Sequence, residues 1–209
     1  MAQARRLRVT IDILEQELYL LSVGLNPGRT IMTEGEKTVK IWTIGHSTRT
    51  LDDFIDVLWH FKIVLLDDVR SYPGSRKNPQ FNKEILSKSL QQKGIEYRHS
   101  KDLGGRRKSR VDSKNLAWRN PMFRGYADYM ESEVFLKGIN DLMEAAYEKR
   151  TVVMCSELLW WRCHRSMIAD YLKVNGFEVI HIFNKSKVVR HPFTSVAKVV
   201  NGKIYYVKK

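Results

Sequence analysis

A cysteine, a histidine and an arginine stand side by side at positions 163–165, where a run of residues with helical apolar spacing begins and continues to Gly176. The start of a helix carries free backbone N–H groups and a partial positive charge, which attract anions and favour a thiolate. The triplet therefore predicts thiolate chemistry at Cys163 and anion binding by His164 and Arg165. The alternatives are that Cys163 is a small buried residue and that Arg165 caps loop carbonyls.

Three further side chains have the chemistry of general acids or bases. His46 follows an apolar run, and its alternative role is that of a helix cap or core histidine. Glu157 follows another such run and is either a general base or half of a structural salt bridge. The same two roles are open to Asp68 and its neighbour Asp67, of which we expect one to be buried.

Basic and aromatic residues are concentrated near these positions. Residues 98–124 hold nine Lys or Arg and only two acidic residues, which predicts a long basic loop or lid. Of the adjacent Trp160 and Trp161, we expect one ring to pack in the core, and the other could stack on a base. The residues predicted to bind phosphate or another anion, besides His164 and Arg165, are Arg70, Arg76, Arg106, Arg107, Lys108 and Arg119.

Zinc is an alternative use of the thiols. Cys155, Cys163 and His164, joined by His46 or His99, have ligand chemistry, but their spacing is irregular and lacks a Cys-x-x-Cys pair. We therefore predict no metal site and no cofactor. In a reducing compartment two cysteines are typical of free thiols or metal ligands rather than of a disulfide.

The elements that position these residues alternate between strand and helix. Strands are predicted at 39–45, 62–69, 95–100, 151–154 and 177–183, and helices at 51–58, 81–93, 126–147 in two pieces meeting near Glu133, and 163–176. Asn201-Gly202 predicts a hairpin over 196–208. The pattern indicates an α/β fold of three layers, with a mostly parallel central sheet of about five strands and helices on both faces. We expect an N-terminal extension at 1–38 and a single domain at 39–209.

Parallel strands place their carboxyl ends at one edge of the sheet, where α/β proteins bind ligands. Four loops should therefore meet: 45–47, 70–76, 97–107 and 155–165. Each of them carries polar, reactive side chains directly after a predicted strand. This arrangement would surround a thiol and an imidazole with positive charge.

An ordered set of motifs between about residues 39 and 183 resembles the domain-of-unknown-function 488 family. The resemblance implies a three-layer α/β domain with the motifs gathered in one pocket, and it implies little about activity. The spacer at 158–161 is less polar than is usual in that family. The motifs are Ile44-Gly45-His46-Ser47, Asp68-Val69-Arg70 with Pro73, Ser75-Arg76 and Phe81, Leu103-Gly104-Gly105, and Cys155, Glu157 and Cys163-His164-Arg165.

Composition narrows the class of function. With 36 Lys and Arg against 23 Asp and Glu, the net charge of +13 favours a polyanionic partner. No apolar run approaches a membrane span or the core of a signal peptide, so we expect a cytoplasmic protein without a membrane partner. The leading hypothesis is an enzyme acting on nucleic acid, DNA rather than RNA, by hydrolytic base removal as in a DNA glycosylase. The alternatives are an enzyme for a small phosphorylated or carboxylate metabolite and a non-catalytic, zinc-binding module.

Overall fold

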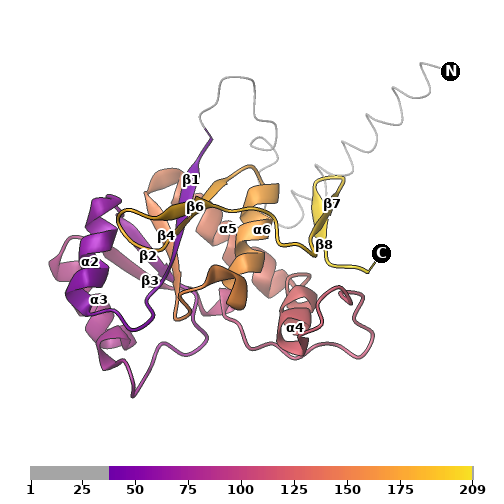
Figure 1. Cartoon of the computed structure of the whole chain (residues 1–209), viewed down its shortest axis with the longest axis horizontal. Coiled ribbons are helices and arrows are strands. Elements are labelled where there is room, and N and C mark those ends of the chain that lie inside the picture. The colour runs from indigo at the N-terminus through magenta and orange to yellow at the C-terminus, as the bar shows by residue number, and fades with distance from the viewer. Residues whose placement is uncertain (1–37, 209) are drawn as a thin grey trace. The chain divides into compact units, whose positions relative to one another are not determined.

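A six-stranded sheet forms the centre of residues 38–208, which are the residues that the computed structural model describes (Figure 1). The extension predicted at 1–38 falls, up to Lys37, outside the described residues. The strand order is β3-β2-β4-β1-β5-β6, and only β6 is antiparallel to its neighbour. The strands are β1 (Lys40–Gly45), β2 (Leu65–Asp68), β3 (Glu96–His99), β4 (Thr151–Cys155), β5 (Glu178–Ile182) and β6 (Val188–Arg190).

Helices cover both faces of this sheet, as predicted. One apolar cluster joins the sheet to α2 (Leu51–His60) and α3 (Lys83–Gln92). A second joins it to α4 (Pro121–Tyr129), α5 (Glu133–Glu148) and α6 (Arg165–Val174). In Figure 1, α2 and α3 lie on one side of the strands and α5 and α6 on the other. The connections β1–β2 and β2–β3 thus use one face, and β3–β4 and β4–β5 use the other, as right-handed crossovers require.

Local sequence signals set the helix starts. The Thr50 hydroxyl accepts a hydrogen bond from the Asp53 backbone N–H at 3.2 Å, which confirms the predicted start of α2. Asn120 and Ser132 cap α4 and α5 in the same way. The break predicted near Glu133 is therefore real, because Ser132 begins a new helix there.

Several predicted bounds were wrong. The sheet has a sixth strand, β6, which sequence reasoning missed because it is a three-residue, exposed edge strand. The second strand begins at Leu65 rather than at 62, and α6 begins at Arg165 because Trp160–Arg162 form a separate 3₁₀ turn. The predicted basic loop 98–124 is partly regular: β3, a 3₁₀ turn at Lys101–Leu103 and the start of α4 leave 104–120 as the loop proper.

The predicted C-terminal hairpin is present as β7 (Lys198–Val200) and β8 (Lys203–Tyr205). Asn201 and Gly202 both have positive φ, at 49° and 69°, which is the backbone of a two-residue hairpin turn. Among the helices of the described residues, none has the length and apolar character that crossing a membrane would take.

Candidate functional site

The ends of β1 and β4 define the position of the site. The connection after β1 leads to β2 and the connection after the neighbouring strand β4 leads to β5, in the opposite direction across the sheet. In α/β sheets, ligands bind at the carboxyl ends of such a strand pair. The two loops start out joined, because His46 N donates to Cys155 O and Ser47 N to Ser156 O, both at 2.9 Å. Gly45 makes this approach possible, since a Cβ there would lie 1.9 Å from the Glu157 carbonyl oxygen.

On the α2–α3 side of this edge, Asp68 and Arg70 form a buried ion pair. Arg70 Nε donates to Asp68 Oδ1 at 2.8 Å and Nη2 to Oδ2 at 2.6 Å. Tyr97 donates its hydroxyl to the same carboxylate at 2.7 Å, and the Phe81 carbonyl accepts a further Arg70 bond. Asp67, also fully buried, pairs with Arg98. Both aspartates are thus buried, where we had expected one, and the Arg70 guanidinium is already surrounded by acceptors.

His46 lies against this pair and is buried. Its ring stacks on Phe81 with centroids 4.2 Å apart. Nδ1 lies 2.9 Å from the Ser47 carbonyl, which can only accept, so Nδ1 carries the proton and Nε2 accepts from Arg70 Nη1 at 3.3 Å. Burial, helped by the Arg70 charge, lowers the pKa of His46 to about 4. The imidazole is therefore neutral at pH 7 with both nitrogens engaged; its predicted catalytic role stays a prediction.

On the opposite side, the two thiols and His164 are in contact. The Cys155 and Cys163 sulfurs are 2.9 Å apart, and Cys163 Sγ is 3.4 Å from His164 Nδ1. His164 Nε2 lies 3.1 Å from the Val69 carbonyl, so Nε2 carries the proton and the Nδ1 lone pair faces Cys163. Burial opposes ionisation of Cys163, but the hydrogen bond from Cys155 and the Arg165 charge outweigh it and lower the pKa of this thiol. Burial raises the pKa of Cys155.

Arg165 is the charged residue next to this cysteine pair. Its Nη2 donates to the carbonyls of Glu157 and Leu158 at 3.0 and 3.3 Å, while Nε and Nη1 are buried with no hydrogen-bond partner. Both contacts are those of the loop-capping alternative. The two unpartnered nitrogens leave donor capacity for an anion, so the predicted anion-binding role of Arg165 stays a prediction.

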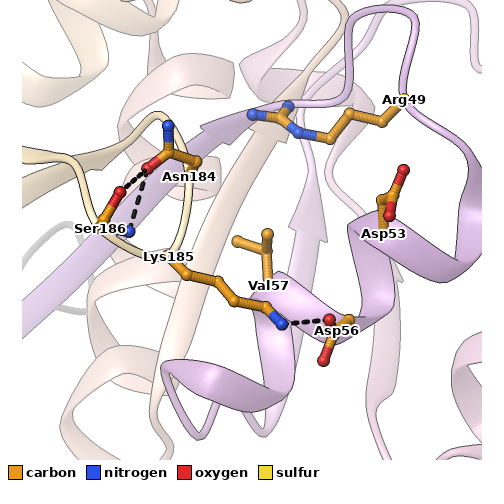
Figure 2. Close-up of a pocket in the computed structure, with 7 residues that line it drawn as sticks. All are labelled: Arg49, Asp53, Asp56, Val57, Asn184, Lys185 and Ser186. Carbon is orange, nitrogen blue, oxygen red and sulfur yellow. Dashed lines mark hydrogen bonds and ion pairs between the residues drawn. The ribbon is translucent and has the colours of Figure 1, made fainter.

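Arg49 is a residue of this site that sequence reasoning missed. It follows β1, and its guanidinium reaches the carbonyls of Gly45 and Phe183, at the ends of β1 and β5. Burial and the nearby Arg165 charge lower the pKa of Arg49. Figure 2 shows Arg49 beside a pocket of about 380 Å³ between α2 and the turn after β5, in which Lys185 pairs with Asp56. No motif marked it, because nothing in the sequence shows that its side chain joins the ends of β1 and β5.

The basic loop 104–120 begins against the cysteine–histidine cluster. A Cβ on Gly105 would lie 2.7 Å from His164 Nδ1, and the Gly105 carbonyl accepts a hydrogen bond from Ser71 at 2.8 Å. Farther along, Asp128 of α4 accepts hydrogen bonds from Arg110 N, Ser113 and Asn115. The loop is therefore fixed at its start and in its middle, and its first residues lie beside the site.

The predicted cations of this loop differ in what they contact. Arg106 is exposed, with its guanidinium 5.7 Å from the centre of the Tyr72 ring. Arg107 stacks over Tyr129 at 3.7 Å and donates to the Gly104 carbonyl, so part of its capacity is structural. The other predicted cations are exposed: Arg76, Lys108 and Arg119.

The two tryptophans divide as expected between core and surface. Trp160 is buried and stacks on His181 with centroids 4.4 Å apart. Trp161 is 48% exposed and contacts Trp160 edge-on and Phe183. Glu157, in the same segment, is exposed at the end of β4. Trp161 and Glu157 therefore present an aromatic face and a carboxylate to solvent above the strand ends.

The side chains of residues 38–208 do not form a set of zinc ligands. No group of three or more His, Cys, Asp or Glu side chains in this range is placed to hold a metal ion. Two thiolates that share a tetrahedral zinc ion lie about 3.8 Å apart. The Cys155 and Cys163 sulfurs, at 2.9 Å, are closer than that, and zinc binding by this pair stays an untested alternative.

Comparison with known proteins gives one match. Residues 50–172 match the family described as domain of unknown function DUF488, which covers more than half of the 209 residues. No curated protein and no solved structure matches the chain. The matched range contains the Asp68–Arg70 pair, the Gly105 contact and the Cys163-His164-Arg165 triplet described above. This chain therefore belongs to the DUF488 family.

Proposed function

We propose that this chain is an enzyme acting on nucleic acid, on DNA rather than RNA, and that it removes a base by hydrolysis. The observation that carries the proposal is the contact of Gly105 with His164, because it sets the start of the basic loop beside the strand-end site. A polyanion bound along this loop would present one of its nucleotides to the loops that follow β1 and β4.

In this proposal the exposed cations of loop 104–120 bind phosphate. Arg106, Lys108 and Arg119 are exposed, so each can form an ion pair with a phosphate without first breaking a buried contact. Tyr72 is 71% exposed beside Arg106 and offers a ring on which an unpaired base can stack. This combination of cations and an aromatic ring is typical of surfaces that track a nucleic-acid strand.

Glu157 is the residue best placed for base hydrolysis. Cleavage of a glycosidic bond builds positive charge on the sugar, which a carboxylate stabilises while it also orients the attacking water. The Glu157 side chain is exposed, whereas the Asp68 carboxylate is buried and occupied by Arg70 and Tyr97. Trp161, four residues on, can stack on a base that has left the duplex.

The metabolite alternative finds less support in the same contacts. It requires Arg70, Arg76 and Arg165 to hold a small anion together. The Arg70 guanidinium is bonded to Asp68 and to the Phe81 carbonyl, and Arg76 is exposed in a separate loop. A small anion would thus have to displace a buried carboxylate from Arg70.

The test is a base-release assay on labelled DNA and RNA strands, on duplexes, and on duplexes with mismatched or damaged bases. Abasic products are revealed by strand cleavage in alkali. We expect Glu157→Gln to abolish base release and to leave binding unchanged, because the amide keeps the shape and loses the charge. Glu84→Gln, an exposed position on α3, is the matched control.

Two outcomes would contradict the proposal. Absence of binding to any of these nucleic acids at low salt would remove the nucleic-acid assignment as a whole. Binding without base release from any substrate would leave a nucleic-acid-binding protein and remove the hydrolytic step.

A further inference from the structure

The two cysteines of the described structure form a cluster that base hydrolysis does not use. Their sulfurs are 2.9 Å apart, although one cysteine ends β4 and the other follows the 3₁₀ turn before α6. Both are free thiols. Packing alone does not require two sulfurs to face each other with an imidazole nitrogen 3.4 Å from one of them.

Cys163 is the member of the pair that is prepared to lose its proton. Its sulfur accepts a hydrogen bond from the Arg165 backbone N–H at 3.5 Å and lies near the Arg165 charge. The hydrogen bonds of the Arg165 side chain go to the Glu157 and Leu158 carbonyls, so a thiolate at Cys163 would supply the negative charge that would balance this buried guanidinium. The His164 Nδ1 lone pair, fixed by the Val69 contact, faces this sulfur and can take the proton transiently, because burial lowers the pKa of His164 and the proton is passed on readily.

Cys155 is suited to the complementary role. Both cysteines are buried, Cys155 at 2% exposed and Cys163 at 6%, so the two roles are assigned by the contacts of each sulfur. Burial keeps Cys155 protonated, and its thiol points at the other sulfur. The pair therefore consists of an attacking sulfur and a second thiol in position to react with it.

We propose that Cys155 and Cys163 form a redox-active dithiol that reduces a hydroperoxide, with Cys163 as the attacking thiolate and Cys155 as the resolving thiol. The Cys163 sulfur attacks the outer peroxide oxygen: an S–O bond forms, the O–O bond breaks, and the alcohol or water leaves with the proton held by His164. Cys163 becomes a sulfenic acid, oxidised by two electrons that the peroxide gains.

The second step closes the disulfide. The Cys155 sulfur attacks the Cys163 sulfur: an S–S bond forms, the S–O bond breaks, and hydroxide leaves with the Cys155 proton as water. Two thiols and one hydroperoxide thus give one disulfide, one alcohol or water, and one further water. An external dithiol, for which dithiothreitol serves as the probe, returns the pair to its reduced state.

The experiment treats the folded full-length chain with hydrogen peroxide and counts the remaining thiols by mass spectrometry after alkylation. We expect both titratable thiols to be lost together, with the loss of two hydrogens and recovery after dithiothreitol. Cys155→Ser should stop at a sulfenic acid on Cys163, which dimedone traps. Cys163→Ser should keep its remaining thiol under the same dose.

Other results would overturn the proposal. They are folded wild-type thiols that survive a dose which oxidises free cysteine, a sulfenic acid that forms on Cys155 in the Cys163→Ser variant, and a disulfide between two chains. Circular dichroism and nucleic-acid binding of both serine variants show that they are folded. Because phosphate contacts are assigned to other residues, failure of the thiol chemistry leaves binding intact and is distinguishable from failure of the proposed function.

Discussion

His46 illustrates how a single buried side chain links stability to pH. In the folded chain its pKa is lowered from 6.5 to about 4, mainly by burial. The unfolded chain therefore takes up a proton near pH 6.5 while the folded chain does not. The contribution of His46 to stability is complete above pH 6.5 and is lost as the pH falls toward 4, at a cost of about 3 kcal/mol.

We expect His46→Gln to flatten the decrease in the free energy of unfolding between pH 6.5 and 4, measured by urea titration at a series of pH values. The remaining decrease would come from His164 and His181, because burial lowers their pKa values as well. His60→Gln, an exposed position at the end of α2, is the control. An unchanged pH profile for His46→Gln would show that the pKa of His46 is the same in the folded and the unfolded chain.

At the scale of the elements, the loops that follow the strands could be predicted from the sequence. Polar residues directly after an apolar run identified the loops at His46, Arg70 and Cys155. These loops could be placed at one edge of the sheet because the carboxyl ends of parallel strands lie together. Side-chain reach was not predictable. Arg49 spans from β1 to β5, and no local pattern encodes such a path. The spacing of Asp68 and Arg70 in the sequence also could not show that the two side chains would form an ion pair, since this depends on their rotamers.

The attachment of α6 to the C-terminal segment was likewise missed, because its partners are far apart in the chain. Asp170 of α6 is fully buried and accepts bonds from His191 Nε2 at 2.9 Å, from the Thr194 hydroxyl at 2.7 Å and from the Tyr206 hydroxyl at 3.0 Å. His191 in turn meets His181, which meets Thr43 of β1. One carboxylate thus connects a helix, the sheet and the segment that leads to the hairpin.

We expect Asp170→Asn to lower the free energy of unfolding by about 3 kcal/mol, because an amide brings a donor to a position where several donors already converge. Hydrogen exchange should become faster at amides of residues 191–206, which the variant releases from α6. Asp141→Asn, at an exposed position on α5, is the control and should change neither quantity. Protection that falls uniformly over the chain would contradict a local attachment.

At the scale of the whole molecule, the question is whether the charge of +13 acts as a diffuse field or through particular residues. A diffuse field depends on net charge alone, so any three reversed lysines or arginines would weaken nucleic-acid binding equally. Localised contacts release counterions only where phosphates lie. The fold separates these two cases, because loop 104–120 borders the strand-end site while α3 carries exposed lysines on the other face of the sheet.

The salt dependence of binding distinguishes them. We expect reversal of Arg106, Lys108 and Arg119 to glutamate to reduce the slope of log K against log salt by about 2 to 3, because up to three phosphate contacts are lost. Reversal of Lys83, Lys88 and Lys93, on or next to α3, changes the net charge equally and should leave the slope nearly unchanged. Fluorescence anisotropy with one labelled DNA strand measures both. Equal losses in the two variants would mean that total charge determines binding, and loop 104–120 would then have no special part in it.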